Sequence, residues 1–255
     1  MTGLNSNIVK GGALLDDTTQ FLASWDPCTR GQDALDRVVS DNTLGLPTRS
    51  RAADIARYVL GPRLVNPGEQ VMLGLRELRH DRESFVDACY YEATRADDLL
   101  SHFAEDAVWN WYAEGRLDVN VELTQEWLQR LADHGDIPSW SDSLSKRVAR
   151  GLTATLRDFG RLSGARKSRR KEVARPGISI GGFVYVSYRL HAQGTPSRGI
   201  LTSKVWRRWL LDEPRVDELM HRLASMGIVF YSVAGSSLRI DWRVDSLEEA
   251  IRAVV

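Results

Sequence analysis

The sequence predicts a mainly α-helical protein with small β-hairpins, arranged as a helical bundle with winged helix-turn-helix-like units. Apolar residues recur at helical spacing through about the first 115 positions. Residues 119–190 then show a helix, a short turn, a second helix, a basic loop and a strand-like segment. Two helices and a hairpin pattern follow in residues 196–255. We therefore expect three parts, at residues 1–115, 116–195 and 196–255.

The first part is predicted to be a helical domain with an acidic surface. Thr48 or Ser50 is expected to cap a helix that Gly61 and Pro62 end. A long helical region is expected over residues 67–102. Residues 81–140 carry 14 Asp and Glu against 4 Lys and Arg, and these acids are expected to form a solvated helical surface.

The middle part is predicted to contain the winged-helix-like unit. Helices are expected over residues 119–135 and 141–160, the second with Ser141 or Ser143 as its cap. An apolar stripe defines the buried side of this second helix, and its members are Leu144, Val148, Leu152, Leu156 and Phe159. Residues 161–177 are expected to form a basic loop. Val184, Val186 and Tyr188 alternate in a segment that is interpreted as a strand.

Positive charge is concentrated in this middle part although the whole chain has no net charge. Residues 141–175 carry 11 Lys and Arg against 3 Asp and Glu, and the stretch GARKSRRK alone carries five positive charges. Such segregation favours a polyanionic partner. Two alternatives are that the basic block docks on the acidic block of the same chain, or that it keeps a loop solvated.

Double-stranded DNA is the predicted partner, because a winged helix places its second helix in the major groove and its basic loop along the backbone. The candidate nucleic-acid-binding residues are Lys146, Arg147, Arg150, Arg166, Lys167, Arg169, Arg170 and Lys171. The candidate secondary phosphate contacts are Arg49, Arg51, Lys204 and Arg207. The alternative for these cations is ordinary surface charge with helix capping and ion pairs.

The last part is predicted to repeat the helix-helix-hairpin plan. Helices are expected over residues 201–211 and 213–227, followed by a hairpin that turns near Ala234 and Gly235 and a terminal helix capped by Ser246. Its charge is nearly balanced, so DNA binding, packing or dimerisation are all open to it. Core packing is expected for most tryptophans, including Trp206 and Trp209.

The sequence holds no recognisable catalytic signature. The patterns GxxxxGK[ST], GxSxG and HExxH are all missing, and the five histidines are scattered. Cys28 and Cys89 are far apart and are interpreted as reduced core thiols. We therefore expect no enzyme activity, no cofactor and no metal. No stretch approaches the roughly 20 apolar residues of a membrane span, so no membrane partner and a cytoplasmic location are expected.

Three stretches resemble the BrxA family of BREX bacteriophage-defence systems over nearly the full length of the chain. They are KGGALLDDT from Lys10, LGLPTRSRAADIARYVLGPRL from Leu44, and SSLRIDWRVDSLEEAI near the C-terminus. The resemblance implies a small cytoplasmic protein encoded with a BREX operon, with a core similar to the RNA-binding antitermination factor NusB. It also implies double-stranded DNA binding through helix-turn-helix-like domains, and other BREX proteins as further partners. It carries no motif of DNA-contacting residues, so the candidate residues come from charge and position alone.

The expected function is that of a non-enzymatic double-stranded DNA-binding accessory protein of a BREX system, with contacts mainly to the phosphate backbone. Three alternatives remain open. One is a protein scaffold within the defence complex, another is RNA binding, and the third is transcriptional regulation.

Overall fold

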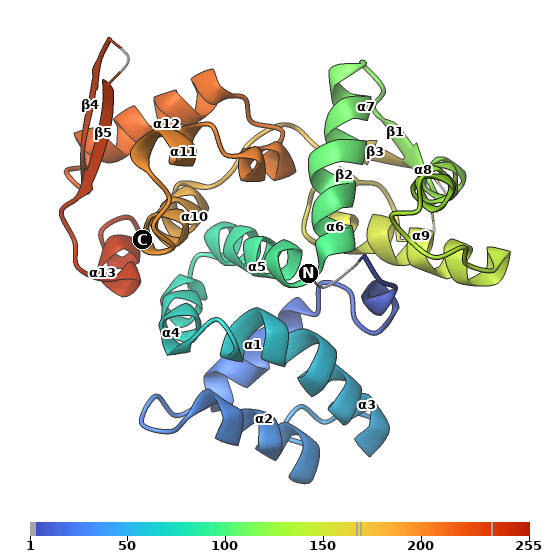
Figure 1. Cartoon of the computed structure of the whole chain (residues 1–255). Coiled ribbons are helices and arrows are strands. Elements are labelled where there is room, and N and C mark those ends of the chain that lie inside the picture. The colour runs from blue at the N-terminus through green and yellow to red at the C-terminus, as the bar shows by residue number, and fades with distance from the viewer. Residues whose placement is uncertain (1–3, 167, 169, 236) are drawn as a thin grey trace.

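The N-terminal half of the protein is helical in the structure, which is a computed structural model describing residues 4–166, 168, 170–235 and 237–255. Figure 1 shows α5 in the middle of the molecule, between the α1–α4 group and the elements that follow. The elements of this half are η1 (Asn7–Val9), α1 (Leu15–Ser24), α2 (Gly31–Ser40), α3 (Arg49–Ile55), η2 (Ala56–Val65), α4 (Glu69–Leu78), α5 (Arg82–Ala96), α6 (Asp98–His102), η3 (Phe103–Val108) and α7 (Trp109–Ala113).

Side-chain caps set the boundaries of these helices. Thr48 accepts a hydrogen bond from the backbone N–H of Arg51 and so begins α3, as one of the two predicted caps. The expected helical region over residues 67–102 is confirmed and consists of α4, α5 and α6, because Asp81 caps α5 and Asp97 caps α6. Each cap satisfies backbone donors that would otherwise have no partner at the start of a helix.

The predicted helix end at Gly61 and Pro62 is wrong. The chain continues through both residues as the π-helix η2, which ends at Val65. A π-helical turn is wider than an α-helical turn, so the proline ring does not meet the carbonyl group one turn earlier. The backbone N–H of Asn66 then donates to the carbonyl oxygen of Gly61 across this wide turn.

The middle of the chain forms a β–α–α–β–β unit. Its elements are β1 (Asp118–Asn120), α8 (Val121–His134), α9 (Asp142–Asp158), β2 (Leu162–Ser163) and β3 (Arg170–Val173). The three strands form an antiparallel sheet in the order β1-β3-β2, in which Val119 pairs with Lys171 and Leu162 pairs with Val173. The predicted basic loop therefore contains two short strands, β2 and β3.

The predicted strand over residues 177–190 is also wrong, because this segment is the helix α10 (Ile180–Ala192). Ser179 caps it by accepting a hydrogen bond from the backbone N–H of Gly182. Residues Phe183 to Val186 are all buried, since α10 packs between α5 and α13. A helix buried on all sides has no polar stripe, so its sequence resembles that of a buried strand.

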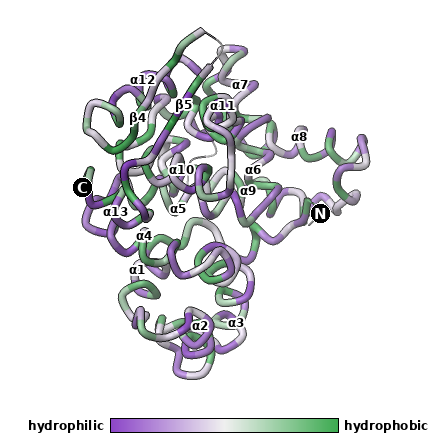
Figure 2. Tube along the Cα trace, turned by 60° about the vertical axis from the view of Figure 1, so that its left-hand side comes forward, coloured by the Kyte–Doolittle hydropathy of each residue, from purple (hydrophilic) through white to green (hydrophobic). Residues whose placement is uncertain are grey.

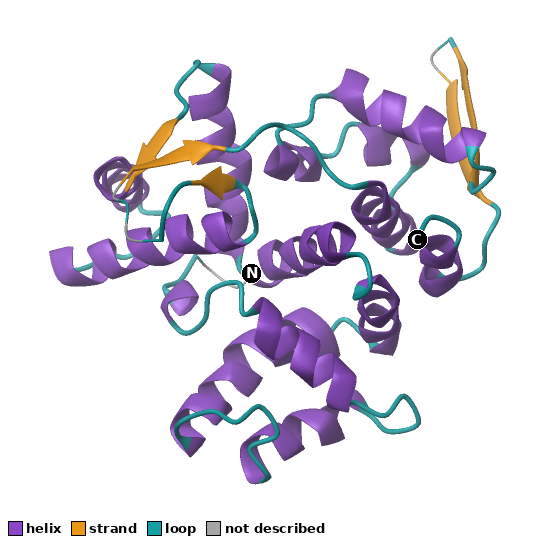
Figure 3. Cartoon of the chain, turned by 180° about the vertical axis from the view of Figure 1, so that it is seen from behind, coloured by secondary structure: helices purple, strands orange, loops and turns teal. Residues whose placement is uncertain are grey.

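The C-terminal part contains a protruding hairpin and returns to the N-terminal helices. Its elements are α11 (Ser197–Leu201), η4 (Lys204–Trp209), α12 (Glu213–Ser225), β4 (Val229–Ala234), β5 (Ser237–Trp242) and α13 (Leu247–Arg252). The predicted hairpin and the predicted Ser246 cap of the last helix are confirmed. Figure 3 shows the hairpin projecting at the edge of the molecule and α13 packed beside α4 and α10.

One continuous hydrophobic core joins these parts. Figure 2 shows hydrophobic and hydrophilic residues alternating along the helices, as amphipathic helices around a shared core require. Trp206 and Trp209 are fully buried, as predicted. Cys89 is buried and its burial raises the pKa of the thiol, whereas Cys28 is exposed and is not the core thiol that was expected. Within the described part of the chain, no helix has the length and apolar content of a membrane span.

Candidate nucleic-acid interface

Helix α9 has one buried side and one exposed basic side. Ser141 begins the helix by accepting a hydrogen bond from the backbone N–H of Leu144. Val148, Leu152 and Leu156 of the predicted apolar stripe are buried against the core. The opposite side carries Lys146, Arg147 and Arg150, and all three are exposed.

These three cations, which we call the α9 basic face, are available to a partner. Residue 150 follows residues 146 and 147 by four and three positions, so the three side chains lie on one side of the helix. None of the three side chains forms a hydrogen bond or ion pair with another described residue. The helix has no acidic residue between Asp142 and Asp158, so no carboxylate of its own neutralises the face.

The described residues between β2 and β3 (164–166 and 168), together with Arg170 and Lys171, are called the wing here; Arg166 lies beside Arg157 of α9, and Lys171 holds the described residues together from inside. Lys171 is only 5% exposed, and its ammonium donates hydrogen bonds to the carbonyl oxygens of Ala165 at 3.0 Å and Ser168 at 2.8 Å. Burial and, to a smaller extent, the nearby Arg157 charge lower the pKa of this ammonium. Lys171 is therefore an internal brace of the wing, which corrects the expectation that it contacts phosphate.

The other described cations of the wing are exposed. Arg166 and Arg170 both point away from the core, and the carbonyl oxygen of Arg166 accepts a hydrogen bond from Arg157. Ser168 stabilises the turn, since its hydroxyl donates to the carbonyl oxygen of Arg170 at 2.7 Å. The predicted candidates Lys167 and Arg169 lie outside the described residues.

A groove with mixed charges borders the wing on the side of α1. It has a volume of about 480 Å³ and is lined by charged residues from four segments, namely Asp16, Asp17, Arg82, Arg157, Asp158 and Arg166. Arg157 already forms an ion pair with Asp158. Burial raises the pKa of Asp17, but three carboxylates still face three guanidinium groups here. The groove is thus no strong anion site, and the excess positive charge lies on the α9 basic face and the wing.

The four candidate secondary contacts do not form one surface with α9. Arg51 is used internally, because its guanidinium donates to the carbonyl oxygen of Lys10. Arg207 stacks over the ring of Trp109 at 5.3 Å in a cation–π contact. Arg49 and Lys204 are exposed on α3 and η4, which are separate elements.

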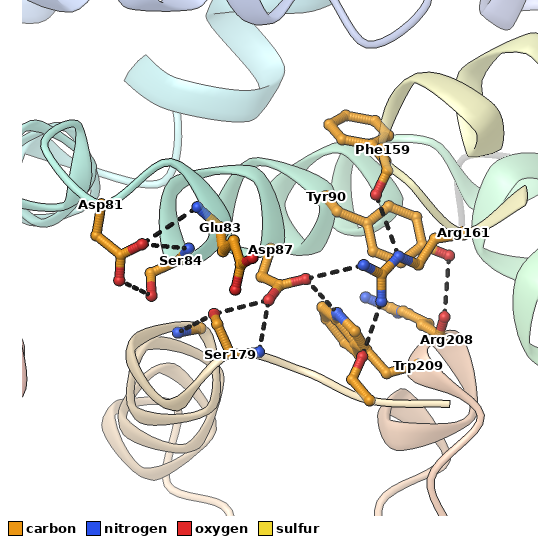
Figure 4. Close-up of polar contacts among 12 residues, drawn as sticks. Asp81, Glu83, Ser84, Asp87, Tyr90, Phe159, Arg161, Ser179, Arg208 and Trp209 are labelled. Atoms are coloured by element: carbon orange, nitrogen blue, oxygen red, sulfur yellow. Dashed lines mark hydrogen bonds and ion pairs between the residues drawn. The ribbon is translucent and has the colours of Figure 1, made fainter. Parts of the chain in front are cut away.

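A buried polar cluster fixes the C-terminal end of α9, and the sequence analysis missed it. Asp87 of α5 accepts hydrogen bonds from the backbone N–H and the hydroxyl of Ser179, at 2.8 and 2.7 Å, and from the indole N–H of Trp209 at 2.8 Å. Arg161, three residues after α9, lies 3.5 Å from the same carboxylate. Figure 4 shows these side chains converging on Asp87.

Arg161 also bridges two loops. Its guanidinium donates to the carbonyl oxygen of Phe159 at 3.1 Å and to that of Gly177 at 2.9 Å. The α9 unit is therefore tied to α5, α10 and η4 through one buried carboxylate. A signal for Asp87 exists in the sequence, since it is an acid within the apolar run from Phe85 to Cys89.

Eight of the 14 acids of the acidic block are exposed, in agreement with the expected solvated surface, but some of the others are used inside the molecule. Glu92 is fully buried and accepts hydrogen bonds from Arg189 and Tyr185, both at 2.9 Å. Glu105 accepts a hydrogen bond from the largely buried Arg208 at 2.6 Å. These acids neutralise cations of the C-terminal half, and they do not pair with the α9 basic face.

Together these features define a class of protein: a mainly helical chain with one shared core and a β–α–α–β–β unit whose longest helix carries an exposed cationic face. The BrxA family model matches residues 4–181, which is more than half of the sequence. The chain therefore belongs to the BrxA family of BREX phage-defence systems.

The fold is similar to that of a solved structure of a bacterial protein. It is the "Crystal structure of an uncharacterized protein from Magnetospirillum magneticum", with a TM-score of 0.61 and 14% sequence identity over 81% of this chain and 97% of that chain. At this identity the likeness concerns the fold alone. No curated protein matches the sequence.

Proposed function

We propose that the protein is a non-enzymatic accessory component of a BREX system that binds double-stranded DNA mainly through its phosphate backbone. The observation that carries this proposal is the α9 basic face, three exposed cations without a partner among the described residues. Cations that the fold itself does not use are free to replace counterions on a phosphate backbone.

The position of α9 supports the proposal. It is the second helix of a β–α–α–β–β unit, and the second helix of a helix-turn-helix unit enters the major groove. Lys146, Arg147 and Arg150 point away from the core along this helix. Most contacts of lysine and arginine with DNA go to phosphate oxygens, so the face favours binding with little sequence information.

The wing adds a second set of contacts in this proposal. Arg166 and Arg170 are exposed and would face phosphates next to the groove that α9 occupies. Lys171 has a positioning role, because its hydrogen bonds to Ala165 and Ser168 set the shape of the wing.

The test is a titration of a fluorescent random-sequence DNA duplex, measured by anisotropy at several salt concentrations. The test variant carries Lys146→Ala, Arg147→Ala and Arg150→Ala together. The slope of log K against log salt is negative, and each lost phosphate contact reduces its magnitude by about 0.9. The triple variant is therefore expected to reduce this magnitude by about 2.7.

A matched control separates contact from net charge. Arg116→Ala, Arg130→Ala and Arg222→Ala remove three other exposed arginines and change the net charge equally. This control is expected to retain the slope of the unmodified protein. Equal weakening by both triple variants, or a preference for an RNA duplex at the same salt concentration, would overturn the proposal.

A further inference from the structure

Strand β4 forms an open edge of the C-terminal hairpin. Its partner β5 lies against α11, where the backbone N–H of Ile240 donates to the hydroxyl of Ser197 at 3.1 Å. On the other side of the hairpin, β4 has no neighbouring strand in the described part of the chain. Figure 3 shows the hairpin extending beyond α12, so the edge is accessible along its outer part.

The hydrogen-bond pattern identifies which backbone groups of β4 point outward. The backbone N–H of Arg243 donates to the carbonyl oxygen of Ile228, which makes these two residues a hydrogen-bonded pair at the base of the hairpin. Pairs in an antiparallel ladder alternate between hydrogen-bonded and non-hydrogen-bonded. Val229, Tyr231 and Val233 therefore direct their N–H and C=O groups to the outer edge. The outward N–H of Ile240, opposite Tyr231, agrees with this assignment.

These outward groups form no hydrogen bond with another described residue of the chain. Neither Tyr231 nor Val233 forms a backbone hydrogen bond across the outer edge with any described residue. The Tyr231 side chain is held against α12, since its hydroxyl donates a hydrogen bond to Asp217 and its ring meets the His221 ring edge to face, with the ring centroids 4.9 Å apart. The side chain thus fixes the hairpin on α12 while the backbone edge stays open.

The composition of β4 lacks the features that usually protect an edge strand. Natural edges are guarded by charged side chains, proline or bulges. The strand VFYSVA has no charged residue and no proline, and its register with β5 contains no bulge. Phe230 is 44% exposed and Val233 is 51% exposed, and Met226 just before the strand is 42% exposed. Three of the five exposed large apolar residues in the described chain therefore gather at this hairpin.

We propose that β4 pairs with β4 of a second copy of this chain, which joins two hairpins into a four-stranded antiparallel sheet across a two-fold axis. The strand is its own best partner, because it is uncharged and no like charges meet when it faces itself. With Tyr231 on the axis, Val233 faces Val229 of the second copy. All outward N–H and C=O groups then find partners, and the two Phe230 rings lie diagonally across the axis.

The size of the contact sets its expected strength. Six residues per strand bury less area than a standard interface of about 1,600 Å², so the dimer is expected to form in a concentration-dependent way. The dimer does not depend on DNA binding. If the proposed function also holds, each dimer presents two α9 basic faces, and their linkage increases the apparent affinity for long DNA.

The experiment is sedimentation velocity of the full chain, without DNA, over a concentration series. The unmodified protein is expected to shift from monomer toward dimer as the concentration rises. Val233→Lys places a charge in the pairing and is expected to leave only monomer. Ser237→Lys is the matched control, since it adds the same charge at an exposed site on β5, and it is expected to dimerise like the unmodified protein.

Amide hydrogen exchange of the unmodified chain provides a second measurement that does not rely on a variant. The amides of Tyr231 and Val233 are expected to become protected as the concentration rises. Those of Phe230 and Ser232 are protected at every concentration, because they point into the hairpin. A chain that stays monomeric throughout, a Val233→Lys variant that dimerises normally, or protection that does not change with concentration would each overturn the proposal.

Discussion

The guanidinium of Arg161 lies 3.5 Å from the carboxylate of Asp87, and this pair joins the end of the α9 unit to α5 in the centre of the molecule. The same carboxylate accepts hydrogen bonds from Ser179 and Trp209. The orientation of the α9 basic face thus depends on a group that never reaches the surface.

Asp87→Asn is expected to destabilise the protein strongly. The amide keeps the shape of the side chain, but its NH2 group is a donor that would face other N–H donors. The substitution also removes the negative charge, so the largely buried Arg161 loses its anionic partner. Breaking one side of a buried, charge-assisted network costs about 2–4 kcal/mol. Urea unfolding followed by circular dichroism measures the loss. Asp136→Asn, at an exposed position, serves as the control and is expected to change stability by less than about 0.5 kcal/mol.

The features predicted from sequence are those with a local cause. The apolar stripe and exposed cations of α9 follow from helical spacing, and the final helix follows from its Ser246 cap. The β4–β5 hairpin also depends on neighbours in sequence, because its strands are separated by two residues.

The features that sequence missed depend on distant residues. Strand β1 has only three residues and exists because Val119 pairs with Lys171. Lys171 was predicted to contact phosphate, but its side chain is buried and donates hydrogen bonds within the wing. Helix α10 was mistaken for a strand because its burial by α5 and α13 removes the polar stripe of an amphipathic helix. The hydrogen-bond donors to Asp87, Ser179 and Trp209, lie 92 and 122 residues away along the chain, so no local pattern could reveal them.

Two helical glycines are expected to respond in opposite ways to alanine. A Cβ at Gly151 of α9 would lie 3.5 Å from the Ile8 side chain, which is ordinary contact, whereas a Cβ at Gly182 of α10 would lie 2.5 Å from the Cβ of Asp87. Gly151→Ala should therefore stabilise the protein by about 0.5–1 kcal/mol through helix propensity. Gly182→Ala should destabilise it by about 1–3 kcal/mol through overpacking. Thermal unfolding of both variants measures the difference, and equal shifts would contradict the close packing of α10 on α5.

The wing distinguishes a residue that contacts DNA from one that positions the contact. Under the proposed function, Arg170→Ala removes a phosphate contact. It is expected to reduce the magnitude of the slope of log K against log salt by about 0.9. Lys171→Met keeps most of the buried side chain but loses the hydrogen bonds to Ala165 and Ser168. It is expected to weaken binding at every salt concentration while the slope stays nearly constant. A slope that falls equally in both variants would mean that Lys171 also contacts phosphate.

The contact between α4 and α13 is expected to make stability depend on pH in the acid range. Arg252 of α13 donates a hydrogen bond to Glu77 of α4 at 2.8 Å, and this bond lowers the pKa of the carboxyl group below its ordinary value of 4.5. The folded state therefore binds the proton of Glu77 more weakly than the unfolded state. The ionised side chain stabilises the fold above pH 4.5, and this contribution is lost as the pH falls through the lowered pKa.

Glu77→Gln tests this expectation, because glutamine resembles the protonated side chain. The unmodified protein should be the more stable of the two at pH 7, and the difference in free energy of unfolding should shrink toward zero as the pH falls below the lowered pKa. Urea unfolding at a series of pH values measures it. Glu126→Gln, at an exposed position with no partner in the described part of the chain, should show no such dependence. A difference that persists undiminished in acid would indicate that Glu77 acts through packing, because its charge would then make no contribution.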